Sequence, residues 1–328
     1  MIKSKSSLLL TAISVLFAFI ILCLTVGVLL YQPETELNFR ISGDESGFSR
    51  NDDYITITKG GEYEISGETA QGSVVIDTNH EIVTLKLNGV NIINNFGPAI
   101  YFKNTSESRV VIEDNTSNTL VDSIIRDSEA DAVIYSVASL DFSGEGQLSL
   151  NGRAQEGIAS DSNVIINSGS YLIYAEDDGI NASTDFESQI IINGGDITIY
   201  SHGDAIDSNG DIIINGGKIK AYADMVDESD GLDFDGELII NGGTIISTGY
   251  GHADDPSDKS KQRFVIYKEN EVQLRDAPFS VLRTIGDKTE NKREKIDSFK
   301  LPKEFRHVLY SSPKLNNEDK FEMFQVYE

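Results

Sequence analysis

The amino-acid sequence predicts an all-β protein whose main domain is a three-sided parallel β-helix, with a transmembrane helix before it and a β capping segment after it. Two observations carry this prediction. A short motif recurs four times, beginning at Gly157, Gly179, Ala205 and Gly231, at intervals of 22, 26 and 26 residues. Each copy leads into an apolar run that is closed by an Asn-Gly-Gly corner or a close variant of it. A repeat of this length is too short for a propeller blade or a helical pair, and it fits one turn of a solenoid built from strands.

Each turn of the solenoid is predicted to hold three short strands. In one clear copy they cover residues 179–182, 189–193 and 196–200, which are rich in Ile and bounded by Gly, Asn or Asp. The corners lie at residues 167–169, 193–195, 215–217 and 241–243. Asn and Gly tolerate the left-handed backbone conformation that a sharp bend between strands requires. We therefore expect the four corner asparagines to form one column that shares hydrogen bonds.

The composition divides the chain into four parts. Residues 1–31 are predicted to form a cytoplasmic stub and membrane anchor, 32–53 a linker, 54–252 the parallel β-helix and 253–328 the C-terminal capping strands. Alternation of apolar and polar residues begins at Tyr54, and the repeats stop at Ala253. The open end of a solenoid needs protection against edge-to-edge pairing, and the tail is the natural candidate for that cap.

The N-terminal segment is predicted to cross the cell membrane once. Leu8 to Leu30 are 23 consecutive residues without a charge, and Lys3 and Lys5 precede them. A helix of this length spans roughly 30 Å of hydrocarbon, and basic residues mark the cytoplasmic side. The domain after the helix is therefore expected to be extracytoplasmic. A cleaved signal peptide is the alternative, but the apolar stretch is longer than usual and no Ala-x-Ala site follows it.

The charge of the chain excludes some partners. The formal net charge is -26, and residues 154–255 contain twenty Asp or Glu against two Lys. Such a surface repels the phosphates of nucleic acids, so no nucleic-acid partner is expected.

Acidic residues gather where the repeats begin. In three repeats an Asp directly precedes the small first residue, and an Asp or Asn lies two positions after it. Stacking at about 4.8 Å per strand would place these side chains in two adjacent columns. Oxygen ligands in this number, without His or Cys, suit Ca²⁺, which takes 6–8 oxygens. The alternative is that they are solvated turn residues. The predicted metal ligands are Asp177, Asp178, Asn181, Asp204, Asp207, Asp230 and Asp233.

Three tyrosines are candidates for carbohydrate contact. Tyr174, Tyr200 and Tyr222 precede the acidic stretches at similar offsets. If the rings point outward, they could stack on sugar faces beside the acidic columns. The alternative is that they pack beneath loops.

Catalytic signals are weak, and no catalytic residue is assigned. The run from Ser201 to Asp204 has the residue types of a hydrolase triad, but adjacent residues of a strand point to opposite faces. A glycosidase could use a pair of the column aspartates. A calcium-dependent lyase would need a basic residue, for which the clear repeats offer only Lys218 and Lys220.

Several segments resemble a known family, the bacterial carbohydrate-binding domain-containing proteins. They are residues 177–182, residues 203–210, the Ile-Ile-Ile-Asn-Gly-Gly strands and residues 309–315. The resemblance covers most of residues 54–328. It implies a right-handed parallel β-helix that is related in fold to pectate lyases, is exported, binds calcium and binds cellulose and polygalacturonate without a need for catalysis. The chain departs from the family pattern at Ala205, at Ser168 and in the basic stretch 288–295.

The sequence thus predicts an extracytoplasmic, calcium-dependent, non-catalytic protein that binds acidic, pectin-like or cellulosic polysaccharide. Two alternatives stay open. One is a calcium-dependent polysaccharide lyase or a glycosidase, and the other is a structural surface stalk or adhesin.

Overall fold

The computed structural model describes residues 38–125, 130–184, 188–224, 229–251, 254–276, 278–285, 292–315 and 320–326. The predicted membrane anchor, residues 1–31, lies outside these ranges. Among the described residues no helix has the length and apolar character needed to cross a membrane.

The domain begins earlier than the sequence predicts. The sequence predicts a linker over residues 32–53, but this range contains two strands that pair with the first rungs, a rung being one turn of the solenoid. Strand β1 (Arg40–Ser42) runs antiparallel to β4 (Gly61–Thr69), and β2 (Phe48–Asn51) runs antiparallel to β3 (Tyr54–Ile57). A 3-10 turn, η1 (Glu45–Gly47), separates β1 from β2. Phe39 is fully buried, so this short polar segment closes the N-terminal end of the core.

The next rungs contain long bent strands. They are β5 (Ser73–Ile93) and β6 (Ile100–Ile112), and the short strand β7 (Ser117–Val121) follows them. The pairing of β5 with β6 is parallel but shifts register between Ile76 and Ile82, where both strands turn the same corner.

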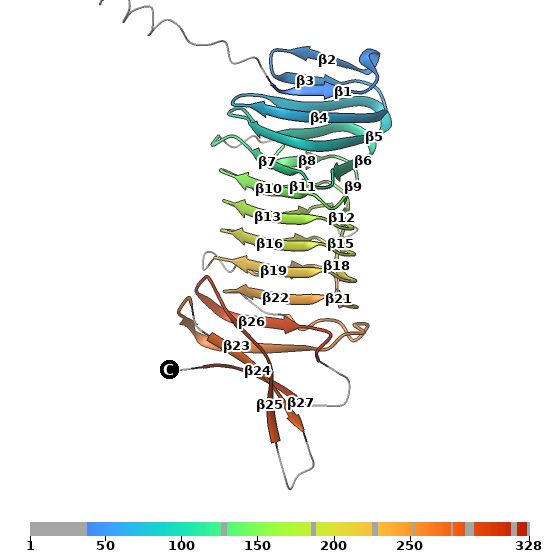
Figure 1. Ribbon diagram of the computed structural model, residues 1–328. Helices are drawn as coiled ribbons and strands as arrows, with labels where there is room; N and C mark the ends of the chain where they lie inside the picture. The colour runs from blue at the N-terminus through green and yellow to red at the C-terminus, as the bar shows by residue number, and fades with distance from the viewer. Residues whose placement is uncertain are drawn as a thin grey trace, which may run out of the picture. The chain divides into compact units, whose positions relative to one another are not determined.

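Between residues 132 and 249 the structure repeats regularly, and each strand before the last rung pairs in parallel with the third strand after it (Figure 1). Three ladders result. The β14 ladder contains β8 (Ala132–Ser136), β11 (Glu156–Ser160), β14 (Ile180–Ala182), β17 (Ile206–Ser208) and β20 (Asp233–Phe234). The β15 ladder contains β9 (Leu140–Ser143), β12 (Val164–Ile166), β15 (Gln189–Ile192), β18 (Asp211–Ile214) and β21 (Leu238–Ile240). The β16 ladder contains β10 (Gln147–Gly152), β13 (Ser170–Ala175), β16 (Asp196–Ser201), β19 (Lys218–Ala223) and β22 (Thr244–Gly249).

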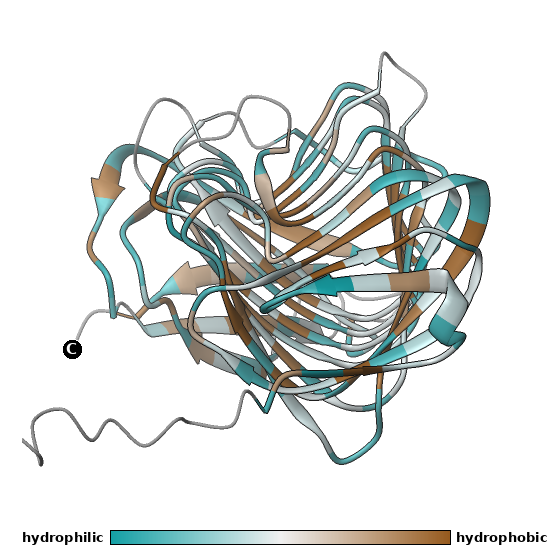
Figure 2. Cartoon of the chain, turned by 90° about the horizontal axis from the view of Figure 1, so that it is seen from above, coloured by the Kyte–Doolittle hydropathy of each residue, from teal (hydrophilic) through white to brown (hydrophobic). Residues whose placement is uncertain are grey.

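The core lies inside the rungs and is built from stacked aliphatic side chains. Seen from above, the strands of successive rungs overlie one another (Figure 2). Exposure alternates along each strand, and the inward residues Ile190, Ile192, Ile212 and Ile214 have no exposed surface. Burying one such side chain contributes roughly 1.5–3 kcal/mol. The alternating pattern therefore fixes which face of each strand points inward.

The corner asparagines form the expected hydrogen-bonded column. Each amide nitrogen donates at 2.8 Å to the amide oxygen one rung earlier, and Asn167 donates at 3.0 Å to Asp141. The glycine that ends each corner has a φ between +89° and +105°, a region that favours glycine. The asparagines of this column, the Asn column, are Asn167, Asn193, Asn215 and Asn241.

The C-terminal segment covers the last rung. Strand β26 (Phe305–Ser311) pairs antiparallel with the edge of β22, and β23 (Phe264–Gln273) pairs with β26. Strands β24 (Pro278–Ile285), β25 (Lys292–Lys300) and β27 (Lys320–Gln325) form a separate three-stranded sheet with β24 in the middle. Its aromatic side chains join a second core with Tyr222 and Ile246 of the solenoid. The free edge of β22 is thereby covered.

Candidate functional site

The backbone holds three aspartates one above the other at the start of the β14 ladder. The carbonyl groups of Asp178, Asp204 and Asp230 each accept a hydrogen bond from the small first residue of the preceding repeat, at 2.9 to 3.0 Å. Residues 181, 207 and 233 are direct neighbours in the same ladder. The two columns predicted from the sequence are therefore present.

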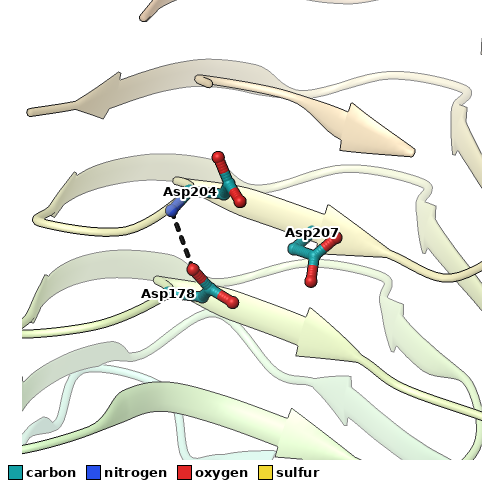
Figure 3. A group of neighbouring side chains, drawn as sticks. All are labelled: Asp178, Asp204 and Asp207. Carbon is teal, nitrogen blue, oxygen red and sulfur yellow. Dashed lines mark hydrogen bonds between the residues drawn. The ribbon is translucent and has the colours of Figure 1, made fainter. Parts of the chain in front are cut away.

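The carboxylates of the first column also bond along it. Asp178 Oδ1 accepts the backbone N–H of Asp204 at 2.7 Å (Figure 3). Asp204 Oδ1 likewise accepts the backbone N–H of Asp230. One oxygen of each carboxylate therefore has a structural role. The other oxygen of Asp178 points toward Asn181, whose amide nitrogen donates to it at 3.0 Å.

Three carboxylates converge at this place. Asp178, Asp204 and Asp207 each offer one oxygen, and these oxygens lie within 4.8 Å of one another (Figure 3). We call these three residues the Asp triad. The amide nitrogen of Asn181 also donates to Asp207 at 3.0 Å, so it bridges two members of the triad.

Burial makes the charge of the Asp triad costly. It raises the pKa of Asp204 to about 7 and that of Asp207 to about 8, and the neighbouring carboxylates add to both shifts. Burial likewise raises the pKa of Asp178, against the hydrogen bond from Asn181. Ionised carboxylates this close repel one another unless a cation or donor lies between them.

The residues of the triad fit a calcium ion. The donor set consists of oxygens only, and Asn181 adds an amide oxygen that is buried and has no hydrogen-bond partner among the described residues. A turn of that amide would exchange its nitrogen for this oxygen between Asp178 and Asp207. Gly203 leaves room for the arrangement, because a Cβ there would lie 2.3 Å from Asp178 Oδ1.

The other predicted ligands lie around the triad but not within it. Asp233 continues the second column and is exposed. Asp230 is 6% exposed and its Oδ1 lies 3.5 Å from Nε2 of His307, a residue of the C-terminal strand β26. Asp177 lies at the corner beside Gly203, whose N–H donates to the Asp177 carbonyl.

The three predicted tyrosines form a stack at the end of the β16 ladder. Tyr174 and Tyr200 are stacked with ring centroids 5.2 Å apart and an interplanar angle of 11°, and Tyr200 and Tyr222 are 5.4 Å apart at 37°. Tyr174 is 47% exposed, whereas Tyr222 is 4% exposed and belongs to the core of the cap. Tyr174 thus points outward, as stacking on a sugar would require, whereas Tyr222 is packed beneath the C-terminal segment.

Sequence reasoning missed a polar group beside this stack. His202 lies with Nδ1 3.1 Å from Glu176 and Nε2 2.9 Å from Asp224, and Asp224 is 2.6 Å from Lys303. Lys303 comes from the C-terminal segment, 102 residues after the Ser201 carbonyl to which it donates. No local pattern could have indicated that contact. Both His202 nitrogens face carboxylates, and the Ser201 hydroxyl donates to the Gly203 carbonyl instead.

Comparison with known proteins gives three matches. A family model described as carbohydrate-binding domain-containing protein matches residues 51–292, more than half of the chain. A carbohydrate-binding domain-containing protein of Acetivibrio thermocellus is 29% identical over 146 residues, which are 42% of this chain and 51% of that relative. The chain therefore spans about half the length of the curated relative that it matches. The solved structure of a polysaccharide lyase-like protein from C. thermocellum, a gadolinium derivative, matches with a TM-score of 0.53 and 25% identity, and the match covers 62% of this chain and 88% of that one.

Proposed function

Because the chain belongs to the carbohydrate-binding domain-containing protein family, we propose that it is an extracytoplasmic, calcium-dependent protein that binds acidic, pectin-like or cellulosic polysaccharide without cleaving it. We infer that its solenoid is a right-handed, three-sided β-helix, the usual hand for a crossover between parallel strands. The observation that carries the proposal is the Asp triad, with three oxygens within 4.8 Å and Asn181 beside them.

Calcium explains how an acidic protein holds an acidic glycan. A Ca²⁺ ion takes 6–8 oxygen ligands, more than the triad and Asn181 supply with one atom each. The remaining positions are open to water or to a uronate carboxylate of polygalacturonate. The ion thereby reverses the sign of the local field, which otherwise repels an anionic chain.

The burial of the triad also supports the choice of a cation. Burial and the neighbouring carboxylates raise the pKa of Asp204 and Asp207, and a cation bound between them would offset their repulsion and stabilise the ionised form.

A lyase is the second candidate, because the matching solved structure is a polysaccharide lyase-like protein. A lyase needs a base beside the calcium-bound sugar. Lys218 is instead paired with Asp196 at 3.0 Å on the exposed face of the β16 ladder, and the described contacts of the triad come from Asn181 and backbone N–H groups. These contacts favour binding over cleavage.

The test is a titration of the full-length chain in detergent with polygalacturonate, with calcium and with a chelator, while newly formed unsaturated chain ends are measured. We expect calcium-dependent binding without new ends. New ends would make the protein a lyase. Calcium-dependent thermal stability without any binding would favour a structural stalk or adhesin. The matched variants are Asp204→Ala with Asp207→Ala, which should lose calcium-dependent binding, and Asp196→Ala, which lies on another ladder and should keep it.

We also propose that residues 8–30 anchor the domain in the cell membrane with residues 38–328 outside the cytoplasm. Protease added to intact cells should remove the domain. Protection of the domain until the cells are broken would contradict this placement.

A further inference from the structure

A pocket of about 270 Å³ opens beside the exposed end of the tyrosine stack. Its floor and walls come from five parts of the chain: the end of β10, the end of β13, the end of β16 with the corner after it, the corner after β19, and the C-terminal segment. The residues that the argument uses are Asn151, Tyr174, Glu176, His202, Asp224 and Lys303. We call this the Tyr174 pocket.

The aromatic stack ends inside this pocket. In the β16 ladder, Tyr222, Tyr200 and Tyr174 are successive neighbours, and the next position toward the N-terminus is Asn151. Tyr200 covers one face of the Tyr174 ring. The other face lies toward Asn151, which is exposed and has only a short amide side chain. The apolar face of a pyranose ring would continue the stack at the position that Asn151 leaves open.

The wall of the pocket presents ordered polar groups. Glu176, His202, Asp224 and Lys303 form a continuous series of contacts of 2.6 to 3.1 Å. Lys303 is only 18% exposed on its side chain, and its donation to the Ser201 carbonyl at 2.8 Å fixes it in place. A concave site with one aromatic face and a few convergent, pre-positioned polar groups is the usual form of a small-molecule or sugar site.

The geometry points to a neutral pyranose ring of a glycan, with equatorial hydroxyl groups, as the ligand: we propose that it stacks on the open face of Tyr174 while its hydroxyl groups bond to Asn151 and the carboxylates of the wall. Equatorial hydroxyl groups leave the two faces of such a ring apolar, which suits stacking. The wall contains two carboxylates and one ammonium group beside an imidazole, so a uronate is disfavoured here. The choice of a glycan rests on the proposed carbohydrate-binding function, but the pocket itself requires no calcium.

The direct test is calorimetric titration of the full-length chain in detergent with the β-1,4-linked hexasaccharides of glucose, xylose and mannose, in calcium and in chelator. We expect at least one of them to bind equally well in both conditions. Tyr174→Ala should weaken that binding about tenfold, the size of one aromatic stacking contact. Leu172→Ala removes another exposed apolar side chain from the same face of β13 and should bind as the natural chain does.

A second variant fills the site instead of emptying it. Asn151→Tyr adds a ring at the next position of the stack, so it should abolish hexasaccharide binding while the melting temperature stays the same or rises. The proposal is overturned if no hexasaccharide binds, if binding requires calcium, or if both Tyr174→Ala and Asn151→Tyr bind normally.

Failure of the proposed calcium function gives a different pattern. Asp204→Asn with Asp207→Asn should lose calcium-dependent polygalacturonate binding and keep hexasaccharide binding. If Asn151→Tyr loses hexasaccharide binding and keeps polygalacturonate binding, the two sites bind their ligands independently.

Discussion

The Asn column and the Asp triad are built from the same repeat geometry and have opposite chemistry. Both place a polar side chain on successive rungs. A neutral amide carries donors and acceptors, so each Asn of the column satisfies the next at 2.8 Å. An ionised carboxylate only accepts, so the Asp triad cannot satisfy itself and relies on backbone N–H groups and Asn181. The side chains of the Asn column therefore satisfy one another's hydrogen bonds within the protein, whereas the Asp triad is suited to a cation.

The largest expected effect comes from giving the Asp triad the neutral amide chemistry of the Asn column. Asp204→Asn with Asp207→Asn keeps the shape of the side chains and removes two charges. We expect calcium affinity to fall about 100-fold or more, because calcium affinity depends on the number of charged ligands. A calcium titration of the full-length chain with a competing indicator measures this. Asp196→Asn removes a charge from another ladder and serves as control. Unchanged affinity in the double variant would rule out the triad as the calcium site.

The second prediction concerns the pH dependence of stability without calcium. An unfolded Asp releases its proton near pH 3.8, whereas the folded protein holds protons at Asp204 up to about pH 7 and at Asp207 up to about pH 8. Between about pH 4 and pH 8 the folded state therefore binds more protons, and the free energy of unfolding falls as pH rises, by several kcal/mol, since a pKa difference of one contributes about 1.4 kcal/mol.

Calcium should reduce this dependence of stability on pH. It binds the ionised form and adds about 2.7 kcal/mol at a concentration 100 times its dissociation constant, and this gain is largest at high pH. Thermal melts at pH 4, 6 and 8, in calcium and in chelator, measure both effects. A chelator-treated protein that is more stable at pH 8 than at pH 5 would contradict the assigned pKa shifts. The double Asn variant should show a flatter pH profile in chelator.

The sequence predicts the repeated part of the molecule well for a physical reason. In residues 156–249 the spacing, the alternating Ile residues and the Asn-Gly corners all specify one rung geometry, so local patterns and the global fold agree. Before Tyr54 this agreement is lost: the segment is polar and short, and pairing with β4 and β3, rather than its own pattern, makes β1 and β2 strands.

The sequence predicts which residues of the candidate site stack in columns, but not which contacts those residues make with the C-terminal segment. Repeat spacing placed Asp178, Asp204 and Asp207 together. It could not show that Asp230 turns toward His307 or that Lys303 reaches the tyrosine stack, because both contacts depend on how the C-terminal segment packs. Long-range packing leaves no periodic signal in a sequence.

A smaller effect is expected from breaking the Asn column. Asn193→Ala removes two side-chain hydrogen bonds, one donated to Asn167 and one accepted from Asn215. Each contributes about 0.5–1.5 kcal/mol, and the lower end applies here because Asn193 is exposed to water. We expect a loss of about 1 kcal/mol in urea unfolding with no change in calcium affinity. A change in calcium affinity would show that the two columns are coupled.

The smallest effect is expected from the third kind of contact between rungs, an exposed ion pair. Lys218 and Asp196 are direct neighbours in the β16 ladder. Lys218 Nζ lies 3.0 Å from Asp196 Oδ2, and the two side chains are 53% and 52% exposed. Water screens such a pair, so Lys218→Ala should cost less than about 0.5 kcal/mol. That small cost should shrink further in salt of about 1 M, where the Debye length is near 3 Å. Urea unfolding of both chains at low and high salt measures it. The opposite outcome is a loss of unfolding free energy that does not depend on salt and is as large as that of Asn193→Ala. Because packing contacts persist when charges are screened, it would mean that the packing of the Lys218 side chain, and not its charge, links these two rungs.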